Sequence, residues 1–163
     1  MRFAQKHEDL LEKLVVVDMG IKEYPMHHEH IIAGIRSVDV ENIKVRREAE
    51  QQMSQHIDSE GVKQFLLKNL HWKEKGKLAW RMNIDVLERE MSNILAPLDE
   101  GEVMTTSLFI RGDLSNYILD EDIADLEDQF PDSEVVTIHD AGHWVHAEAP
   151  GPFLDALLSF CLR

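Results

Sequence analysis

Three polar side chains with types suited to acid–base chemistry lie far apart in the sequence. Asp18 closes the apolar run LVVVD, Ser115 follows the run SLFIRG, and His143 lies in the turn DAGHW after the run EVVTIHD. An imidazole acts as a general base when a carboxylate or a hydroxyl holds it in one tautomer and one direction. These residue types therefore predict the base and the orienting group of a nucleophilic triad.

The runs that precede these residues are typical of parallel strands. Leu14–Gly20 begins with four consecutive apolar residues, which favours a strand covered on both faces. Later in the chain we expect a strand at Ser107–Gly112, a helix at Asp120–Phe130, a strand at Glu134–Asp140 and a helix at Gly151–Arg163. This order is that of a right-handed βαβ crossover. Because the carboxyl ends of parallel strands meet at one edge of a sheet, the three polar residues should gather there.

Helical patterns occupy most of the remaining sequence. Residues 1–14 predict an amphipathic helix. The segment 22–98 predicts a helical insertion, with apolar stripes in HEHIIAGIRSV, REAEQQMSQHI, SEGVKQFLLKNL and NIDVLEREMSNIL, and with Ser59 as an N-cap. His71–Asn83 predicts either a short hairpin around Gly76 or a loop. Long inserts of this kind often form lids over a site.

Composition argues against several classes of protein. The chain has 17 basic and 31 acidic residues and a formal net charge of −14, which argues against a general nucleic-acid or anionic-membrane surface. No run approaches the roughly 18 apolar residues of a membrane span, and the pattern of a signal peptide is absent. The single cysteine, Cys161, forms no internal disulfide and is expected to be buried on the last helix. We therefore expect a cytoplasmic globular protein.

Four segments resemble those of α/β-hydrolase-fold esterases, namely LVVVDMG, QFLLKNL, FIRGDLSNY and DAGHWVHAEAPGPF. The likeness is to small bacterial acyl-esterases and their mitochondrial α/β-hydrolase-domain relatives. It extends over essentially the whole chain, and AGHWVHAE is its most specific part. The resemblance implies a partial α/β-hydrolase fold. The last three parallel strands and their helices would lie in 1–21 and 99–163, and a cap or lid would lie in 22–98.

The resemblance also implies roles for the candidate residues. His143 matches the catalytic histidine after the last strand, and Asp18 matches an acid at the end of the sixth strand. Ser115 occupies the position after the seventh strand that usually holds the acid. The orienting group therefore stays open among Asp18, Ser115 and Asp113. Asp18 is the better electrostatic partner, because a carboxylate stabilises an imidazolium and a hydroxyl carries no charge.

The expected substrate is a small acyl ester or thioester, and no cofactor is expected. We assign Tyr117 and Trp144 to its binding site, together with Trp72 and Trp80 of the insertion. Several histidines cluster in HHEH and HDAGHWVH, but zinc needs three or four converging ligands. Gly142 and the strand before it argue against the continuous helix that would align the second cluster. We therefore expect no metal site.

The serine nucleophile of this fold is not recognisable in the sequence. The fold places serine, acid and histidine in that order, with the serine in a G-x-S-x-G elbow, and no such motif occurs in the 163 residues. MRFAQKHEDLLEKL resembles the helix that begins at the elbow, so we expect the nucleophile upstream of Met1 and an inactive chain by itself.

An exposed strand edge is the second consequence of that resemblance, because the first strand here would lack a neighbour. We expect the chain either to be unstable alone or to pair through this edge with a second copy of the chain or with a complementing N-terminal half. The alternative to a hydrolase is a non-catalytic module that binds a partner through this edge or through the lid helices.

Overall fold

The computed structural model describes all 163 residues, which form two compact units. The core unit comprises Met1–Glu23 and Pro97–Arg163, and the insert unit comprises Tyr24–Ala96. The sequence places the insertion at 22–98, so each junction differs from its expected place by two residues. A role for the insert unit as a lid stays a prediction. No helix in either unit is long and apolar enough to cross a bilayer.

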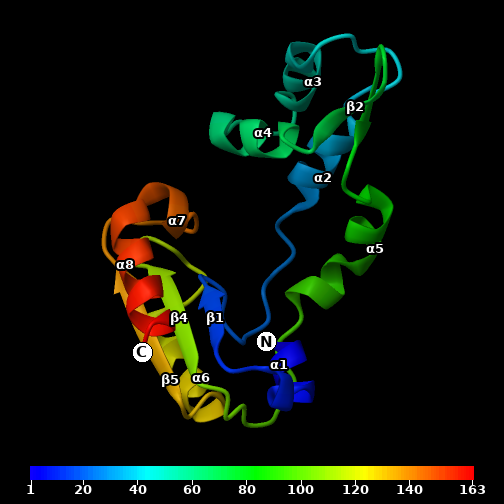
Figure 1. Cartoon of the computed structure of the whole chain (residues 1–163). Helices are drawn as coiled ribbons and strands as arrows, with labels where there is room; N and C mark the ends of the chain where they lie inside the picture. The colour runs from blue at the N-terminus through cyan, green and yellow to red at the C-terminus, as the bar shows by residue number, and fades with distance from the viewer. The chain divides into compact units, whose positions relative to one another are not determined.

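Three parallel strands form the sheet of the core unit (Figure 1). They are β1 (Leu14–Val17), β4 (Ser107–Gly112) and β5 (Ser133–Ile138), in the spatial order β1-β4-β5. Val17 lies opposite Ile110, so the carboxyl ends of β1 and β4 reach the same edge of the sheet. The parallel arrangement expected from the strand–helix–strand order is confirmed. In this sheet β1 has β4 as its neighbour on one side and forms an edge.

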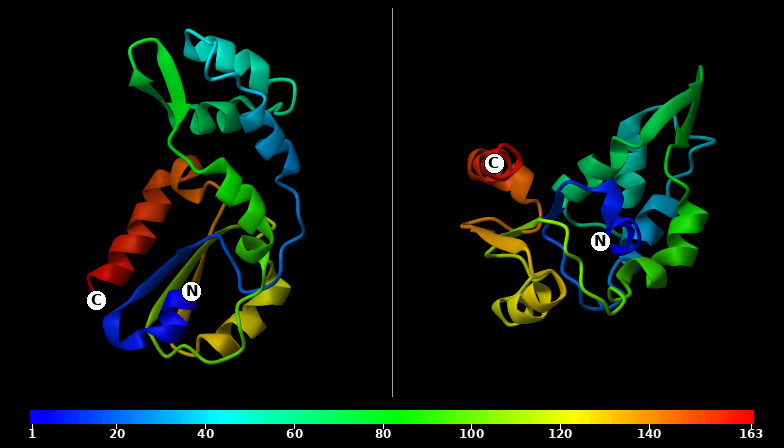
Figure 2. Two further views of the ribbon diagram at one scale, coloured as in Figure 1. Left: turned by 90° about the vertical axis from the view of Figure 1, so that its right-hand side faces the viewer. Right: turned by 60° about the horizontal axis from the view of Figure 1, so that its bottom comes forward.

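Hydrophobic clusters cover both faces of the sheet, and successive side chains of a strand point into one cluster or the other. Phe109 packs on one face against Phe130, with ring centroids 5.1 Å apart. Leu108 and Ile110 pack on the other face, with Phe160. Figure 2 shows α6 (Ile123–Gln129) and α8 (Pro150–Cys161) on opposite sides of the sheet. The helical segments of the core unit are α1 (Arg2–Lys6), η1 (Glu8–Leu10), η2 (Asp120–Asp122), α6 (Ile123–Gln129), α7 (Val145–Glu148) and α8 (Pro150–Cys161).

Two expectations about the core unit are wrong. The helix expected over 1–14 stops at Lys6, because His7 leaves helical geometry at φ −145° and a short 3₁₀ turn follows. Phe3 and Leu10 are exposed, so burial does not sustain a longer helix there. Cys161 is exposed rather than buried, since α8 turns Phe160 toward the sheet and places the next side chain outside.

The insert unit is helical apart from one hairpin. Its elements are α2 (Glu29–Arg36), α3 (Arg46–Met53), α4 (Glu60–Leu67), β2 (Leu70–Glu74), β3 (Lys77–Trp80) and α5 (Ile84–Leu95). Ser59 accepts the Val62 N–H at the start of α4, as expected of its N-cap. Of the two alternatives for the stretch around Gly76, the antiparallel hairpin is confirmed, and Gly76 has the positive φ of +81° that favours glycine in a tight turn.

Phe109→Ala tests the hydrophobic packing on the faces of the sheet. Removing this fully buried ring should lower the free energy of unfolding by about 3–5 kcal/mol, because both the transfer of the ring and the cavity it leaves are unfavourable. Urea denaturation followed by circular dichroism measures the change. Phe3→Ala is the control: the Phe3 side chain is exposed, so a change within about 0.5 kcal/mol is expected. Equal losses in both variants would contradict the arrangement.

Candidate active site

Asp18 is a fully buried carboxylate at the carboxyl end of β1. Its φ of +46° lies in the left-handed region, which aspartate tolerates better than most residues. The Asp18 N–H donates to the Ile110 carbonyl at 2.7 Å, which continues the pairing with β4 by one residue. The left-handed turn then ends the strand, at the edge where β4 also ends.

His143 hydrogen-bonds to this carboxylate. Its Nδ1 lies 2.8 Å from Asp18 Oδ2, and 44% of the His143 side chain is exposed whereas that of Asp18 is inaccessible. With Nδ1–H donating to the carboxylate, Nε2 carries the lone pair and is the basic nitrogen. The pair has the geometry of a general base oriented by an acid.

The three candidates for the orienting group occupy different places. Asp18 contacts His143 directly, as described. The Ser115 hydroxyl donates to Asp18 Oδ2 at 2.5 Å, so it touches the acid. Asp113 instead pairs with His139, with 3.0 Å between Oδ2 and Nδ1, and this hydrogen bond lowers the pKa of the Asp113 carboxyl. The structure thus brings the first two together with the histidine and leaves Asp113 in a separate pair.

Gly112, the last residue of β4, allows the loop that carries His143 to approach the sheet. Its N–H donates to Asp18 Oδ1 at 3.2 Å. A Cβ here would lie 2.2 Å from the Ala141 carbonyl oxygen and 2.5 Å from that of Gly142. Both obstacles are backbone atoms, which cannot rotate away as a side chain can. The position therefore requires glycine.

The side chain of Glu148 binds backbone N–H groups of the same loop. Its carboxylate accepts the Gly142 N–H at 2.7 Å and the Trp144 N–H at 3.2 Å, so the residues on both sides of His143 bind one side chain. Trp144 is the N-cap of α7, and an acidic side chain that binds N–H groups at a helix start resembles half of a capping box. Neither Gly112 nor Glu148 was among the predicted site residues. The signal for Glu148 is an acidic residue one helical turn after the glycine turn.

Tyr117 lies against His143. Its ring stacks on the imidazole of His143, with centroids 4.0 Å apart and an interplanar angle of 19°. Burial, and to a lesser extent the charge of Asp18, raises the pKa of Tyr117 above its ordinary value. The substrate-binding role predicted for Tyr117 stays a prediction, but its contact places it within the site.

The predicted tryptophans are distributed over both units. Trp144 follows His143 in the core unit and is half-buried. In the insert unit, Trp80 packs against the hydrophobic core, whereas 52% of Trp72 is exposed. Their substrate-binding roles stay predictions. No group of three or more histidine, cysteine, aspartate or glutamate side chains is arranged to hold a metal ion.

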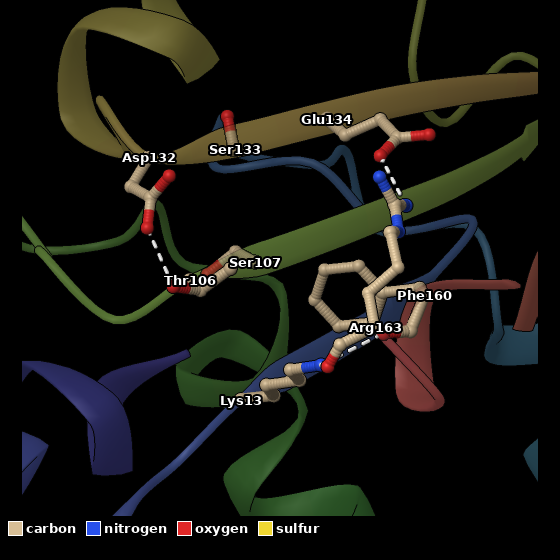
Figure 3. Close-up of a pocket in the computed structure, with 8 residues that line it drawn as sticks. All are labelled: Lys13, Thr106, Ser107, Asp132, Ser133, Glu134, Phe160 and Arg163. Atoms are coloured by element: carbon tan, nitrogen blue, oxygen red, sulfur yellow. Dashed lines mark hydrogen bonds and ion pairs between the residues drawn. The ribbon is translucent and has the colours of Figure 1, made fainter.

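A cavity of about 430 Å³ lies at the amino ends of the strands (Figure 3). Ser107 and Ser133, which begin β4 and β5, line it. In Figure 3 the side chain of Arg163 reaches along its rim to Glu134, with 2.6 Å between the charged atoms. Asp18 follows the other end of β1, so this cavity is not part of the candidate site.

Known proteins resemble nearly the whole chain. The sn-1-specific diacylglycerol lipase ABHD11 of Mus musculus is 32% identical over 167 residues, which cover 98% of this chain and 54% of the lipase. Esterase YbfF of Escherichia coli (strain K12) is 36% identical over 150 residues, covering 91% of this chain and 57% of that esterase. The solved structure of a marine microorganism esterase matches with a TM-score of 0.90 and 38% identity, over 97% of this chain and 64% of that one.

No family model matches the chain, and the chain spans about half the length of the curated relatives it matches. The parallel sheet and its solved neighbours nevertheless define an α/β-hydrolase fold, present here in part. The chain belongs to the α/β-hydrolase-fold esterase family, and it corresponds to the C-terminal portion expected from its motifs.

Gly112→Ala tests how closely the loop approaches the sheet. The added methyl should push the loop away, lower the free energy of unfolding by about 1–3 kcal/mol and shift the NMR signals of the His143 ring. Gly151→Ala is the matched control, because a Cβ on that helical glycine meets nothing within 4 Å. An unchanged His143 spectrum in the Gly112 variant would contradict the close packing.

Tyr117 provides a pH-dependent test. Its pKa is raised in the folded state, so the protein should lose stability as the pH rises through the ordinary tyrosine value of about 10, where the unfolded chain ionises first. Asp18→Asn removes one cause of the shift, and burial remains as the other. NMR titration of the tyrosine rings should therefore give Tyr117 a lower pKa in Asp18→Asn than in the parent.

Proposed function

We propose that this chain supplies the general base and its orienting acid to a serine hydrolase that cleaves carboxylic esters or thioesters. One observation carries the proposal: His143 Nδ1 lies 2.8 Å from an Asp18 carboxylate that is wholly inaccessible to water. A buried carboxylate bound to a partly exposed imidazole is the arrangement that general-base catalysis needs.

In the proposed reaction, Nε2 of His143 takes the proton of a serine hydroxyl as its oxygen attacks the acyl carbonyl carbon. The same proton then passes to the departing alcohol or thiol as the carbon–oxygen or carbon–sulfur bond breaks. Water repeats the cycle on the acyl-enzyme and restores the serine. Asp18 stabilises the imidazolium that forms in each step and fixes the tautomer that leaves Nε2 basic.

Ser115 acts in this proposal through Asp18. Its hydroxyl donates to the carboxylate oxygen that also binds His143, and it therefore satisfies an acceptor that would otherwise be buried without enough donors. Ser115 is thus a positioning residue. It lacks a glycine elbow, so it is a poor candidate for the nucleophile.

We assign the nucleophile and the oxyanion donors to residues outside these 163, since the chain contains no G-x-S-x-G motif. The similar proteins named above are described as esterases and as a diacylglycerol lipase, which supports an ester carbonyl as the reacting group.

A second candidate function is association through the edge of β1. This strand has β4 on one side, and an edge strand presents unpaired N–H and C=O groups to another chain. The candidate needs no chemistry at His143. Activity that depends on this histidine separates the two candidates.

A graft tests the hydrolase proposal. The segment of the marine microorganism esterase that matches this chain is replaced by residues 1–163, and hydrolysis of p-nitrophenyl acetate and butyrate is measured. An active graft should lose on the order of 10⁶-fold in kcat with His143→Ala and about 10⁴-fold with Asp18→Asn. Ser115→Ala should lose about tenfold, because one hydrogen bond to the acid disappears.

His146→Ala is the control, since this histidine is exposed and follows His143 by three residues. A folded graft that hydrolyses the esters equally well without the His143 imidazole would refute the proposal. The isolated 163-residue chain gives an independent readout: the NMR signal of the His143 Nδ1 proton should lie far downfield and disappear in Asp18→Asn.

A further inference from the structure

The hairpin of the insert unit carries a basic tip. The consecutive exposed residues Trp72–Lys77 include Lys73, Lys75 and Lys77 and a single acidic residue, Glu74. The whole chain has a formal net charge of −14. The tip therefore carries the opposite sign of charge to the protein that presents it.

An aromatic side chain accompanies these lysines. Trp72 is 52% exposed, although its cross-strand neighbour Leu78 is buried in the core of the insert unit. The apolar face of the hairpin thus continues from that core into solvent. An indole has an apolar body and a polar N–H, and tryptophan is enriched where hydrocarbon meets headgroups at membrane surfaces.

The base of the hairpin is anchored within its own unit. Arg46 Nη2 donates to the Leu70 carbonyl at 2.9 Å, and the Arg81 N–H donates to the Asn69 carbonyl at 2.9 Å. Figure 2 shows the hairpin extending past the helices of the insert unit. The tip therefore projects, while hydrogen bonds within the insert unit hold the base of the hairpin in place.

We propose that this tip, Trp72–Lys77, docks on anionic lipid surfaces. Each basic side chain near such a surface strengthens binding by roughly fivefold, and the indole enters the headgroup region. The acidic side chains that share a cavity with Lys73 and Lys77 are Glu41 and Glu74, and Glu74 pairs with Lys77 at 3.7 Å. The three lysines still outnumber these two carboxylates. The local sign of the tip is therefore positive.

The net charge of the whole chain does not prevent this contact. At physiological salt, exposed charges separated by more than about 8 Å are largely screened, so a membrane that touches the tip responds mainly to the tip. An exposed indole beside lysines suits a lipid surface, because its apolar body can enter the headgroup region while the lysines contact anionic headgroups. This docking goes beyond ester hydrolysis and requires no catalysis.

Co-sedimentation of the 163-residue chain with vesicles tests the proposal. We expect binding to vesicles of phosphatidylcholine with phosphatidylserine, weak binding to phosphatidylcholine alone, and loss of binding as sodium chloride is added. Combined Lys73→Gln, Lys75→Gln and Lys77→Gln substitutions should weaken binding on the order of 100-fold. A blue shift of tryptophan fluorescence on binding should disappear in Trp72→Phe.

The matched control combines Lys6→Gln, Lys44→Gln and Arg47→Gln, which remove the same charge from exposed positions outside the hairpin. The control should bind within a few-fold of the parent, and circular dichroism verifies that every variant is folded. The proposal is overturned if the hairpin variant binds anionic vesicles as well as the parent does, or if the parent does not bind them. It is also overturned if the control loses as much affinity for the vesicles as the hairpin variant does. None of these measurements depends on ester hydrolysis, so each proposal stands or fails separately.

Discussion

The core unit is organised by a single requirement: the carboxylate of Asp18 is buried and must find donors. A buried ionised carboxylate is strongly destabilising unless hydrogen bonds or a charged partner compensate for the water it has lost. The donors are the Gly112 N–H, the Ser115 hydroxyl and the His143 ring. They come from the end of β4 and from the loops after β4 and β5. The Asp18 side chain thus connects the ends of three strands by hydrogen bonds. The His143 imidazole is held in place because it is one of the donors that compensate for the burial of this carboxylate.

This requirement explains residues that have no chemistry of their own. Gly112 is bound to the acid by its N–H and is overlain by the Ala141 carbonyl, so a side chain at 112 would separate the two loops that meet there. Glu148 fixes the backbone on both sides of His143. A base held at the ring nitrogen and at the flanking amides has little freedom to turn. In the proposed reaction, this restraint sets the geometry of proton transfer before a substrate arrives.

The sequence predicts the strands that carry this site better than the residues that hold its loops in place. Strands rich in Val, Ile and Leu at 14–17 and 107–112 follow from local composition. The strand–helix–strand order of the last third of the chain indicates the parallel direction of β4 and β5. Asp18 and His143 follow from their positions after such strands. Gly112 and Glu148 do not, since their roles depend on carbonyl and amide groups brought near by the tertiary fold. The exposure of Cys161 shows the same limit, because an apolar helix end carries no sign of which side lacks a neighbour.

The edge of β1 lies next to Asp18, the residue that follows this strand. His143 contacts Asp18 and Tyr117, and all three residues belong to the core unit. A further strand added beside β1 in the parallel direction would end at the edge where Asp18 already lies, because parallel neighbours share the direction of their carboxyl ends. An antiparallel neighbour would deliver its carboxyl end to the cavity at the opposite end of the sheet. The direction of pairing at this one edge therefore decides whether a residue that follows the added strand reaches the base.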